Sequence, residues 1–392
     1  MLALDERWRE LTAALEELRA EQNRESKALS GAPTPEQRTR LATLAARGRE
    51  LSDLESAAGA EREAALAQLP NLPAADAAPS DTVLYERDPV AAAGGAPRAG
   101  RAGRDHLELA GPRIDMERGA RTSGARFHYL RGDLVLLELA VVRYAIGKLA
   151  GEGFEPVITP VLARERALFG TGMLPDTEQQ LYQLPADDLY LVGTSEVALA
   201  SLHDGEILDG DALPRRYAGI SSCFRREAGA AGRDTRGIFR VHQFDKVEMF
   251  AFVEPSESAS EHERILAIEE SICADLGLPY RVVNIAVDDL GPSAAKKYDI
   301  EVWLPGQQQY RELTSCSNTT DYQARRLDIR YRPADGGRPA CVHTLNGTAV
   351  TSSRTIVALL ENGQQEDGSI VIPEVLAAFG VPAVLPPAGE LG

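Results

Sequence analysis

The segment SSCFRREAGAAGRDTRGIFRVHQFDKVEMF, residues 221–250, decides how the whole chain is interpreted. Strand-like residues at 216–224 lead into it, and an alternating apolar and polar pattern at 238–253 leads out of it. Between them lies a loop of small residues that is far longer than a two-residue hairpin turn. Five arginines fall within sixteen residues here, although the 392-residue chain has a net charge of −17: Arg225, Arg226, Arg233, Arg236 and Arg240.

The alternation after the loop predicts a strand with two different faces. Its odd-numbered positions are mostly apolar, so that face can pack against a core. The even-numbered face is then free to present functional groups to a ligand. These groups are Arg240, His242, Phe244, Lys246 and Glu248.

The arginines around the loop allow two interpretations. Guanidinium groups bind phosphate oxygens through paired hydrogen bonds, and long loops of this kind are usually retained for binding. Alternatively, the segment is an exposed hairpin whose arginines form ion pairs with Glu227, Asp234 and Asp245. Charge alone leaves both interpretations open.

Two other stretches carry polar groups suited to a ligand. VGTSEV at 192–197 would place Thr194 and Glu196 on one face of a strand, where they could hold an ammonium group. RELTSCSN at 311–318 offers oxygen ligands for a hard cation such as Mg²⁺, which favours one or two carboxylates plus substrate phosphates. Those ligands are Glu312, Thr314 and Ser315. A solvated strand would explain either stretch on its own.

The last informative stretch, residues 344–376, predicts a strand that turns at Asn346-Gly347 and a helix that begins near Arg354. Further helices are expected at 133–150 and 257–276, with short strands between them. This mixture predicts an α+β domain at 105–392, built on a largely antiparallel sheet.

The N-terminal segment 1–70 predicts an antiparallel helical hairpin. Leu4, Trp8, Leu11, Leu15 and Leu18 follow the spacing of a coiled-coil seam, and SGAPTP at 30–35 interrupts the helix. Heptads alone favour an oligomerisation coiled coil. Residues 71–104 are rich in Ala, Pro and Gly, which is the composition of a linker.

The composition, the N-terminus and the apolar segments argue against a secreted, membrane-spanning or zinc-binding protein. The charged N-terminus lacks a secretory signal, and Glu138 and Arg143 interrupt the most apolar helix, so no membrane span is expected. The four cysteines lie far apart without CxxC spacing, which favours reduced thiols in the cytoplasm and predicts no zinc site. P-loop, Rossmann and nucleophile-elbow motifs are absent from the sequence.

The identity, order and spacing of these stretches closely resemble bacterial seryl-tRNA synthetases, a family of class II aminoacyl-tRNA synthetases. The resemblance covers residues 105–376 and, less tightly, the hairpin. Residues 224–250 are similar to the family's motif 2 and residues 345–376 to motif 3. The helix at 133–150 with the following GFEPVITPVL is similar to motif 1, the dimer element.

The resemblance implies a cytoplasmic homodimer that activates L-serine with ATP and Mg²⁺ and transfers it to tRNA(Ser), with tRNA(Sec) as a second candidate acceptor. It also implies that the hairpin reads tRNA, which reverses the preference for an oligomerisation seam. By resemblance, Arg225 and Arg354 are catalytic. The implied ATP-binding residues are Arg225, Arg226, Glu227, Arg240, Val241, Phe244, Glu312, Leu313, Thr314, Ser315 and Arg354. The implied serine-binding residues are Thr194, Ser195, Glu196, Arg225, Glu248, Asn346 and Thr348. The implied Mg²⁺ ligands are Glu312 and Ser315.

The sequence departs from the family pattern at several points. TSE at 194–196 replaces the common TAE, Thr348 replaces a common Ser, and TAVTSS before Arg354 lacks glycines often found there. The chain also enters its coiled coil directly, without a short preceding helical section. Two alternatives stay open: a specialised or resistance paralogue that activates serine or a related amino acid for another acceptor, and a noncatalytic RNA-binding protein on the same scaffold.

Overall fold

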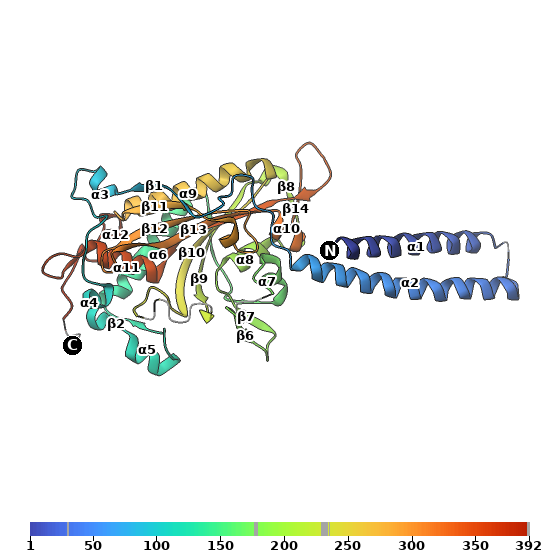
Figure 1. The fold of residues 1–392 in the computed structure, drawn as a ribbon, viewed down its shortest axis with the longest axis horizontal. Helices are drawn as coiled ribbons and strands as arrows, with labels where there is room; N and C mark the ends of the chain where they lie inside the picture. The colour runs from blue at the N-terminus through green and yellow to red at the C-terminus, as the bar shows by residue number, and fades with distance from the viewer. Residues whose placement is uncertain (30, 176–178, 229–233, 235, 390–392) are drawn as a thin grey trace. The chain divides into compact units, whose positions relative to one another are not determined.

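The computed structural model consists of two compact units that divide between Pro70 and Asn71. The residues it describes are 1–29, 31–175, 179–228, 234 and 236–389. The first unit is helical, and the second unit contains the sheet and the remaining helices (Figure 1).

The first unit is an antiparallel hairpin of α1 (Leu2–Lys27) and α2 (Pro35–Ala67), as the sequence predicted. Thr34 caps α2 in a capping box with Gln37, and Pro35 occupies the first helical turn, where no backbone N–H is needed. The Trp8 indole N–H donates to Glu55 at 2.8 Å, which ties the two helices together. Residue 30, in the predicted break, lies outside the described residues.

The second unit is built on an eight-stranded sheet. Along the sheet the strands are β1 (Thr82–Arg87), β11 (Tyr280–Asn284), β12 (Lys296–Leu304), β13 (Gln309–Thr320), β16 (His343–Thr351), β10 (Gln243–Val253), β9 (Arg215–Phe224) and β4 (Glu155–Ile158). Neighbouring strands are antiparallel, except that β4 runs parallel to β9 at the edge. The predicted antiparallel α+β fold is confirmed.

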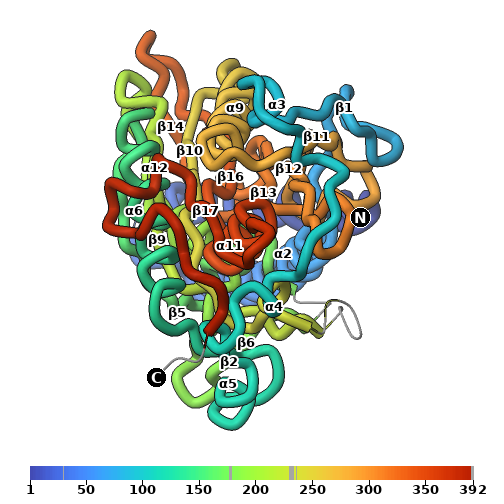
Figure 2. Tube along the Cα trace, turned by 90° about the vertical axis from the view of Figure 1, so that its left-hand side faces the viewer, coloured from blue at the N-terminus to red at the C-terminus, as the bar shows by residue number. Residues whose placement is uncertain are grey.

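Three long helices pack against the sheet: α6 (Asp133–Gly151), α9 (Ser258–Asp275) and α11 (Ser352–Gly363). The first two lie on the same face, because the Tyr144 hydroxyl and Lys148 of α6 both bond Asp275 of α9 (Figure 2). Odd-numbered residues of β10, such as Met249, enter the core beneath these helices. The opposite face of β10 carries Lys246 and Glu248 and then Phe250, which packs in a second cluster with α8 (Glu196–Ala200).

The predicted linker at 71–104 is wrong as a structural description. Its residues 82–87 form edge strand β1, which pairs antiparallel with β11. Asn71 is buried and its amide donates to the backbone oxygens of Ser293 and Thr319 at 2.9 and 2.8 Å. Proline and glycine here shape a chain that follows the sheet and bonds to it, which composition alone does not distinguish from a free linker.

Short elements complete the second unit. The helices are α3 (Pro89–Ala92), α4 (His106–Ala110), α5 (Met116–Ser123), α7 (Glu165–Thr171), α10 (Tyr322–Arg326) and α12 (Glu374–Ala377). The strands are β2 (Ile114–Asp115), β3 (Tyr129–Leu130), β5 (Leu162–Ala163), β6 (Tyr182–Leu184), β7 (Leu189–Leu191), β8 (Ile207–Asp209), β14 (Arg330–Arg332), β15 (Ala340–Cys341), β17 (Ile370–Val371) and β18 (Val384–Leu385). Within the described ranges, no helix has the length and apolar character needed to cross a membrane.

Candidate active site

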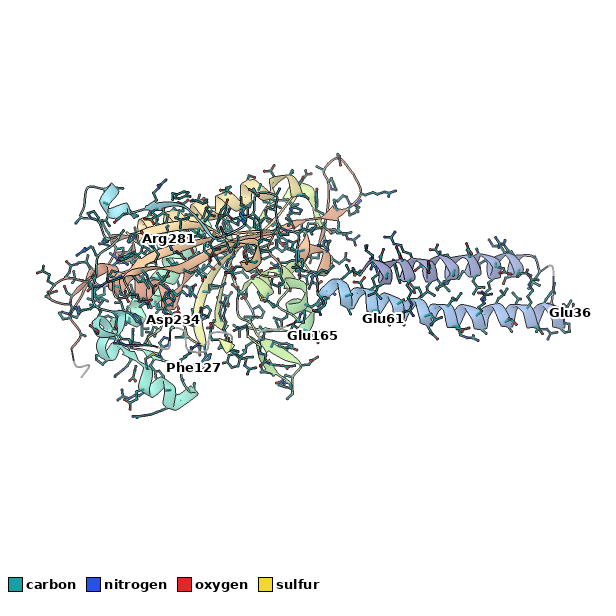
Figure 3. The ribbon with its side chains drawn as sticks, viewed as in Figure 1. Glu36, Glu61, Phe127, Glu165, Asp234 and Arg281 are labelled. Atoms are coloured by element: carbon teal, nitrogen blue, oxygen red, sulfur yellow. The ribbon has the colours of Figure 1, made fainter. Side chains whose placement is uncertain are left out.

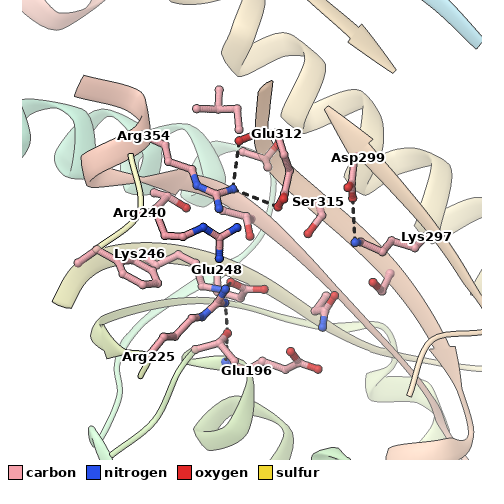
Figure 4. Close-up of a pocket in the computed structure, with 18 of the residues that line it drawn as sticks. Glu196, Arg225, Arg240, Lys246, Glu248, Lys297, Asp299, Glu312, Ser315 and Arg354 are labelled. Atoms are coloured by element: carbon pink, nitrogen blue, oxygen red, sulfur yellow. Dashed lines mark hydrogen bonds and ion pairs between the residues drawn. The ribbon is translucent and has the colours of Figure 1, made fainter. Parts of the chain in front are cut away.

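A cavity of about 540 Å³ opens on the sheet face opposite α9. Asn346 and Thr348 of β16 line it, whereas Gly347 between them faces α9, where an added Cβ would lie 2.3 Å from Ile265. Most of the other lining residues come from β10, β12, β13, the start of α11 and the segments before β10, α8 and β12 (Figure 4). The alternation of the central strands therefore gathers polar side chains from distant segments into one space.

Arg225 lies directly after β9, which ends at Phe224, and lines the cavity. Its Nε donates to the backbone oxygen of Gly193 at 3.2 Å, and its guanidinium carbon lies 5.4 Å from the ring centre of Phe244. The backbone acceptor and the aromatic face position one cation at the middle of the cavity. A positioned guanidinium is suited to bind phosphate and carboxylate oxygens.

Arg354, in the first turn of α11, joins this helix to β13. Its Nη1 donates to the backbone oxygen of Glu312 at 3.0 Å and lies 3.1 Å from its Oε1. Burial would raise the pKa of Glu312, but the nearby cations Arg354, Lys297 and Arg225 outweigh it and lower the pKa to about 2. The carboxylate therefore stays ionised at neutral pH.

Arg240 shows that the ion-pair interpretation of the loop was correct in part. It pairs with Glu227, and its Nε lies 3.7 Å from Asp234, which is labelled in Figure 3. Arg240 also lines the cavity, and β9 and β10 are inner strands of the sheet, so the segment is not an exposed hairpin. Asp245 does not take part in this cluster as predicted, since it accepts from the Ser222 hydroxyl at 2.6 Å. Arg233 lies outside the described residues.

The far end of the cavity is rich in buried carboxylates. Lys246 pairs with Glu248 and donates to the Thr194 hydroxyl at 2.7 Å. Glu196 accepts from the Gln323 amide at 2.7 Å. Burial, followed by the charge of Glu248, raises the pKa of Glu196. Glu196 and Glu248 together offer more carboxyl oxygens than Lys246 alone can bond. Some of these oxygens therefore stay available as hydrogen-bond acceptors for an added ammonium group.

The predicted strand at 192–197 is wrong, because Thr194 and Ser195 lead into α8. The Thr194 hydroxyl accepts from the backbone N–H of Glu196 at 3.2 Å, a local bond that suits a helix start. Thr194 and Glu196 still both line the cavity, but through this turn and not through strand alternation.

Most of the predicted site residues are brought together, with exceptions. Ser195 is fully buried away from the cavity lining, and Arg226 lines a different hollow with Tyr182 and Tyr190. The side-chain hydroxyl of Thr314, predicted as a cation ligand, donates instead to Glu269 of α9 at 3.1 Å. The predicted residues that line the cavity are Thr194, Glu196, Arg225, Glu227, Arg240, Val241, Phe244, Glu248, Glu312, Leu313, Thr314, Ser315, Asn346, Thr348 and Arg354.

Sequence reasoning missed three charged residues of the lining: Asp289, Lys297 and Asp299. Lys297 Nζ lies 3.3 Å from Asp299 Oδ1. Burial is the main cause that raises the pKa of Asp299 to about 7, and Lys297 opposes it. The alternation of KKYDIEV in β12 could have placed both residues on one face.

The fold and site define a class II aminoacyl-tRNA synthetase. Residues 181–363 match the family model of the tRNA synthetase class II core domain (G, H, P, S and T). Residues 1–73 match the seryl-tRNA synthetase N-terminal domain. The chain belongs to the seryl-tRNA synthetase family.

Similar proteins span nearly the whole chain. The serine–tRNA ligase of Thermobifida fusca is 50% identical over 396 residues, covering 99% of this chain and 92% of the relative. That of Streptomyces coelicolor is 50% identical, covering 97% and 90%. The crystal structure of seryl-tRNA synthetase from Pyrococcus horikoshii complexed with ATP matches with a TM-score of 0.90 at 38% identity, covering 99% of this chain and 93% of that one.

Proposed function

We propose that the cavity performs serine–tRNA ligation in two steps, as an ATP-dependent class II synthetase. The observation that carries this proposal is that one cavity has two chemically different ends, with Arg225 between them (Figure 4). Arg240 and Arg354 provide positive charge on one side, and Glu196 and Glu248 provide carboxylates on the other. A triphosphate suits the first end and an amino-acid ammonium group suits the second.

The first step joins serine to the nucleotide. An oxygen of the serine carboxylate attacks the α-phosphorus of ATP, the bond from that phosphorus to the bridging oxygen breaks, and pyrophosphate leaves. In the second step, a hydroxyl of the terminal adenosine of tRNA attacks the seryl carbonyl and AMP leaves. The protein contributes mainly position and charge stabilisation, and Arg225 would neutralise charge on the carboxylate and α-phosphate.

Discrimination against related amino acids would rest on buried polar groups. Glu196 and Glu248 would accept hydrogen bonds from the substrate ammonium group, and Asn346 and Thr348 lie beside them on β16. Alanine also has an ammonium group, so discrimination depends on the polar groups that bond the serine hydroxyl. A site that commits polar groups to this hydroxyl rejects alanine strongly, because alanine leaves them unpaired.

Mg²⁺ fits the nucleotide end of the cavity. Glu312 supplies an ionised carboxylate and Ser315 a hydroxyl, and both line the cavity. The described residues contain no cluster of three or more His, Cys, Asp or Glu that could hold a metal alone. One carboxylate, a hydroxyl and substrate phosphates are a usual Mg²⁺ environment, in which the ion supplies charge neutralisation to the phosphates.

Glu312→Gln should lower ATP–pyrophosphate exchange at least about a hundredfold and raise the Mg²⁺ concentration needed for half-maximal exchange. Protons do not compete at Glu312 near neutral pH because its pKa is about 2. The assay is exchange over a Mg²⁺ titration. Glu301→Gln is the matched control, since Glu301 faces Glu312 across the β12–β13 ladder but bonds Arg281 at 2.5 Å. Equal Mg²⁺ dependence in both variants would refute the ligand role of Glu312.

A second copy of the chain is the proposed partner at the β4 edge of the sheet. Ile158 at the end of β4 is 85% exposed, and Leu139 of α6, which packs against β4, is 56% exposed. Exposed apolar side chains beside an unpaired edge strand favour burial in an interface. The family resemblance of α6 and β4 to the motif 1 dimer element points the same way.

Ile158→Asp should therefore convert a dimer into a monomer, because it would bury an unpaired charge in the interface. Light scattering coupled to gel filtration measures the mass directly. Val83→Asp provides the control, since Val83 is 44% exposed on β1 at the opposite edge of the same sheet. A wild-type monomer, or an Ile158→Asp dimer of unchanged stability, would contradict this interface.

The hairpin of α1 and α2 is proposed to bind tRNA(Ser), and tRNA(Sec) where the cell charges it with serine. Support comes from the match of residues 1–73 to the seryl-tRNA synthetase N-terminal domain. The presence of this hairpin disfavours an acceptor other than tRNA. The cytoplasm is the proposed location, because tRNA charging takes place there and the four cysteines are free thiols.

A further inference from the structure

The strands β13 and β16 separate beneath the active-site cavity. Their antiparallel ladder runs from Thr320–Thr344 to Cys316–Gly347 and ends there. Beyond that point β13 continues beside β12, with Ser315 opposite Asp299, and β16 continues beside β10, with Thr348 opposite Glu248. The cavity therefore lies over a fork in the sheet, and the two branches carry different proposed substrate-binding residues.

Glu269 of α9 reaches this fork from the opposite face of the sheet. The Thr314 hydroxyl of β13 donates to its Oε2 at 3.1 Å. On β16, the backbone N–H of Thr348 opposes the rise in the pKa of Glu269, and a Cβ added at Gly347 would lie 2.9 Å from Glu269 Oε1. One carboxyl group thus lies against both branches where their own ladder has ended.

The position is an unfavourable one for a carboxyl group. Glu269 is 1% exposed, and burial, assisted by Glu248 and Asp299, raises its pKa well above the usual range. Among the described residues its Oε1 has no hydrogen-bond partner of ordinary geometry. A leucine here would bury a similar surface without the cost of desolvating an acid, so packing alone does not account for the glutamate.

We propose that Glu269 is a positioning residue for serine, which links β13 to β16 at the fork so that Asn346 and Thr348 face the bound amino acid. This inference rests on the proposed serine-binding role of that strand. Both branches pair with an outer strand, but the nucleotide branch has a further support that does not involve Glu269, because Arg354 bonds the backbone and the carboxylate of Glu312. Loss of Glu269 should therefore weaken serine binding more than ATP binding.

The test is ATP–pyrophosphate exchange by the full chain, with separate titrations of serine and ATP. Glu269→Leu should raise KM for serine about tenfold, the factor of one lost buried hydrogen bond, and change KM for ATP less than about twofold. Glu269→Gln should restore KM for serine to within about threefold of wild type, since a neutral amide resembles a neutral acid in shape and hydrogen bonding.

Glu270→Leu is the matched control on the same helix. Glu270 bonds the hydroxyls of Tyr85 and Tyr280 at 3.1 and 3.0 Å and does not line the cavity. This variant should lose thermal stability while both KM values stay within about twofold of wild type. The Glu270→Leu control therefore shows whether any lost hydrogen bond of α9 raises KM for serine, or only the loss of the Glu269 contacts at the fork.

Several results would overturn the inference. They are an unchanged KM for serine in Glu269→Leu, a parallel rise of both KM values, or the same rise in Glu270→Leu. If Glu269→Leu does not fold, Thr314→Val decides in its place: it removes only the hydroxyl, and an unchanged KM for serine would overturn the inference. A wild-type chain that fails to exchange with serine would instead refute the proposed function.

Discussion

Arg225→Ala should reduce serine-dependent ATP–pyrophosphate exchange to near background, a loss of about 10²- to 10³-fold or more. The side chain is fixed by the Gly193 backbone oxygen at 3.2 Å and by the ring of Phe244, so it meets the substrates without rearrangement. Its removal would leave the developing phosphate charge without its central cation. Arg225→Lys should recover only part of the activity, because an ammonium group cannot make the paired bonds of a guanidinium.

Arg226→Ala is the control that distinguishes position from charge. The adjacent arginine is exposed and lines the hollow beside Tyr182 and Tyr190 instead of the cavity. Its exchange rate should stay within about threefold of wild type, as for most surface substitutions. Equal losses in the two variants would show that the loop needs positive charge in general, and would refute the central position given to Arg225.

Deletion of residues 2–68 should preserve serine-dependent exchange and lower kcat/KM for tRNA charging by about a hundredfold or more. Among the described residues, those that line the cavity all lie between Met173 and Arg354, and the chain divides between Pro70 and Asn71. The shortened chain keeps Asn71, whose amide bonds Ser293 and Thr319 of the larger unit. Loss of the hairpin should therefore impair tRNA charging and leave ATP–pyrophosphate exchange intact.

The measurement compares exchange and tRNA charging by the shortened and full chains at equal concentration. Melting curves of both chains show whether the larger unit stays folded. Retained charging of serine tRNA by the folded, shortened chain would contradict the role proposed for the hairpin. Loss of exchange would show that the site depends on residues 2–68.

Much of the site could be predicted where strand alternation governs it. The even-numbered residues of β10 include Phe244, Lys246 and Glu248, and all three line the cavity. The same period of two could have identified Lys297 and Asp299 on β12. In each case a local pattern determines which face a side chain occupies, and the antiparallel sheet brings those faces together.

Other features depend on contacts that no local pattern contains. Thr194 and Glu196 meet the cavity through a helix start, and a β-bulge between Ile300 and Glu301 alters the pairing of β12 with β13 near Thr314. The Thr314 hydroxyl therefore reaches Glu269 of α9, although Thr314 also lines the cavity and was grouped with Glu312 and Ser315 by spacing. Glu269 lies on a helix behind the sheet, so only the assembled fold relates it to the site.

The central claim is that this cavity activates serine with ATP, and ATP–pyrophosphate exchange by the full chain tests it most directly. Serine, threonine, alanine and cysteine are compared in the presence of Mg²⁺, and the chain is then tested for charging of serine tRNA. The account predicts strong exchange with serine, at least about a hundredfold weaker exchange with alanine, and charging of the tRNA. Absence of exchange with serine, or exchange that favours another of these amino acids, would contradict it.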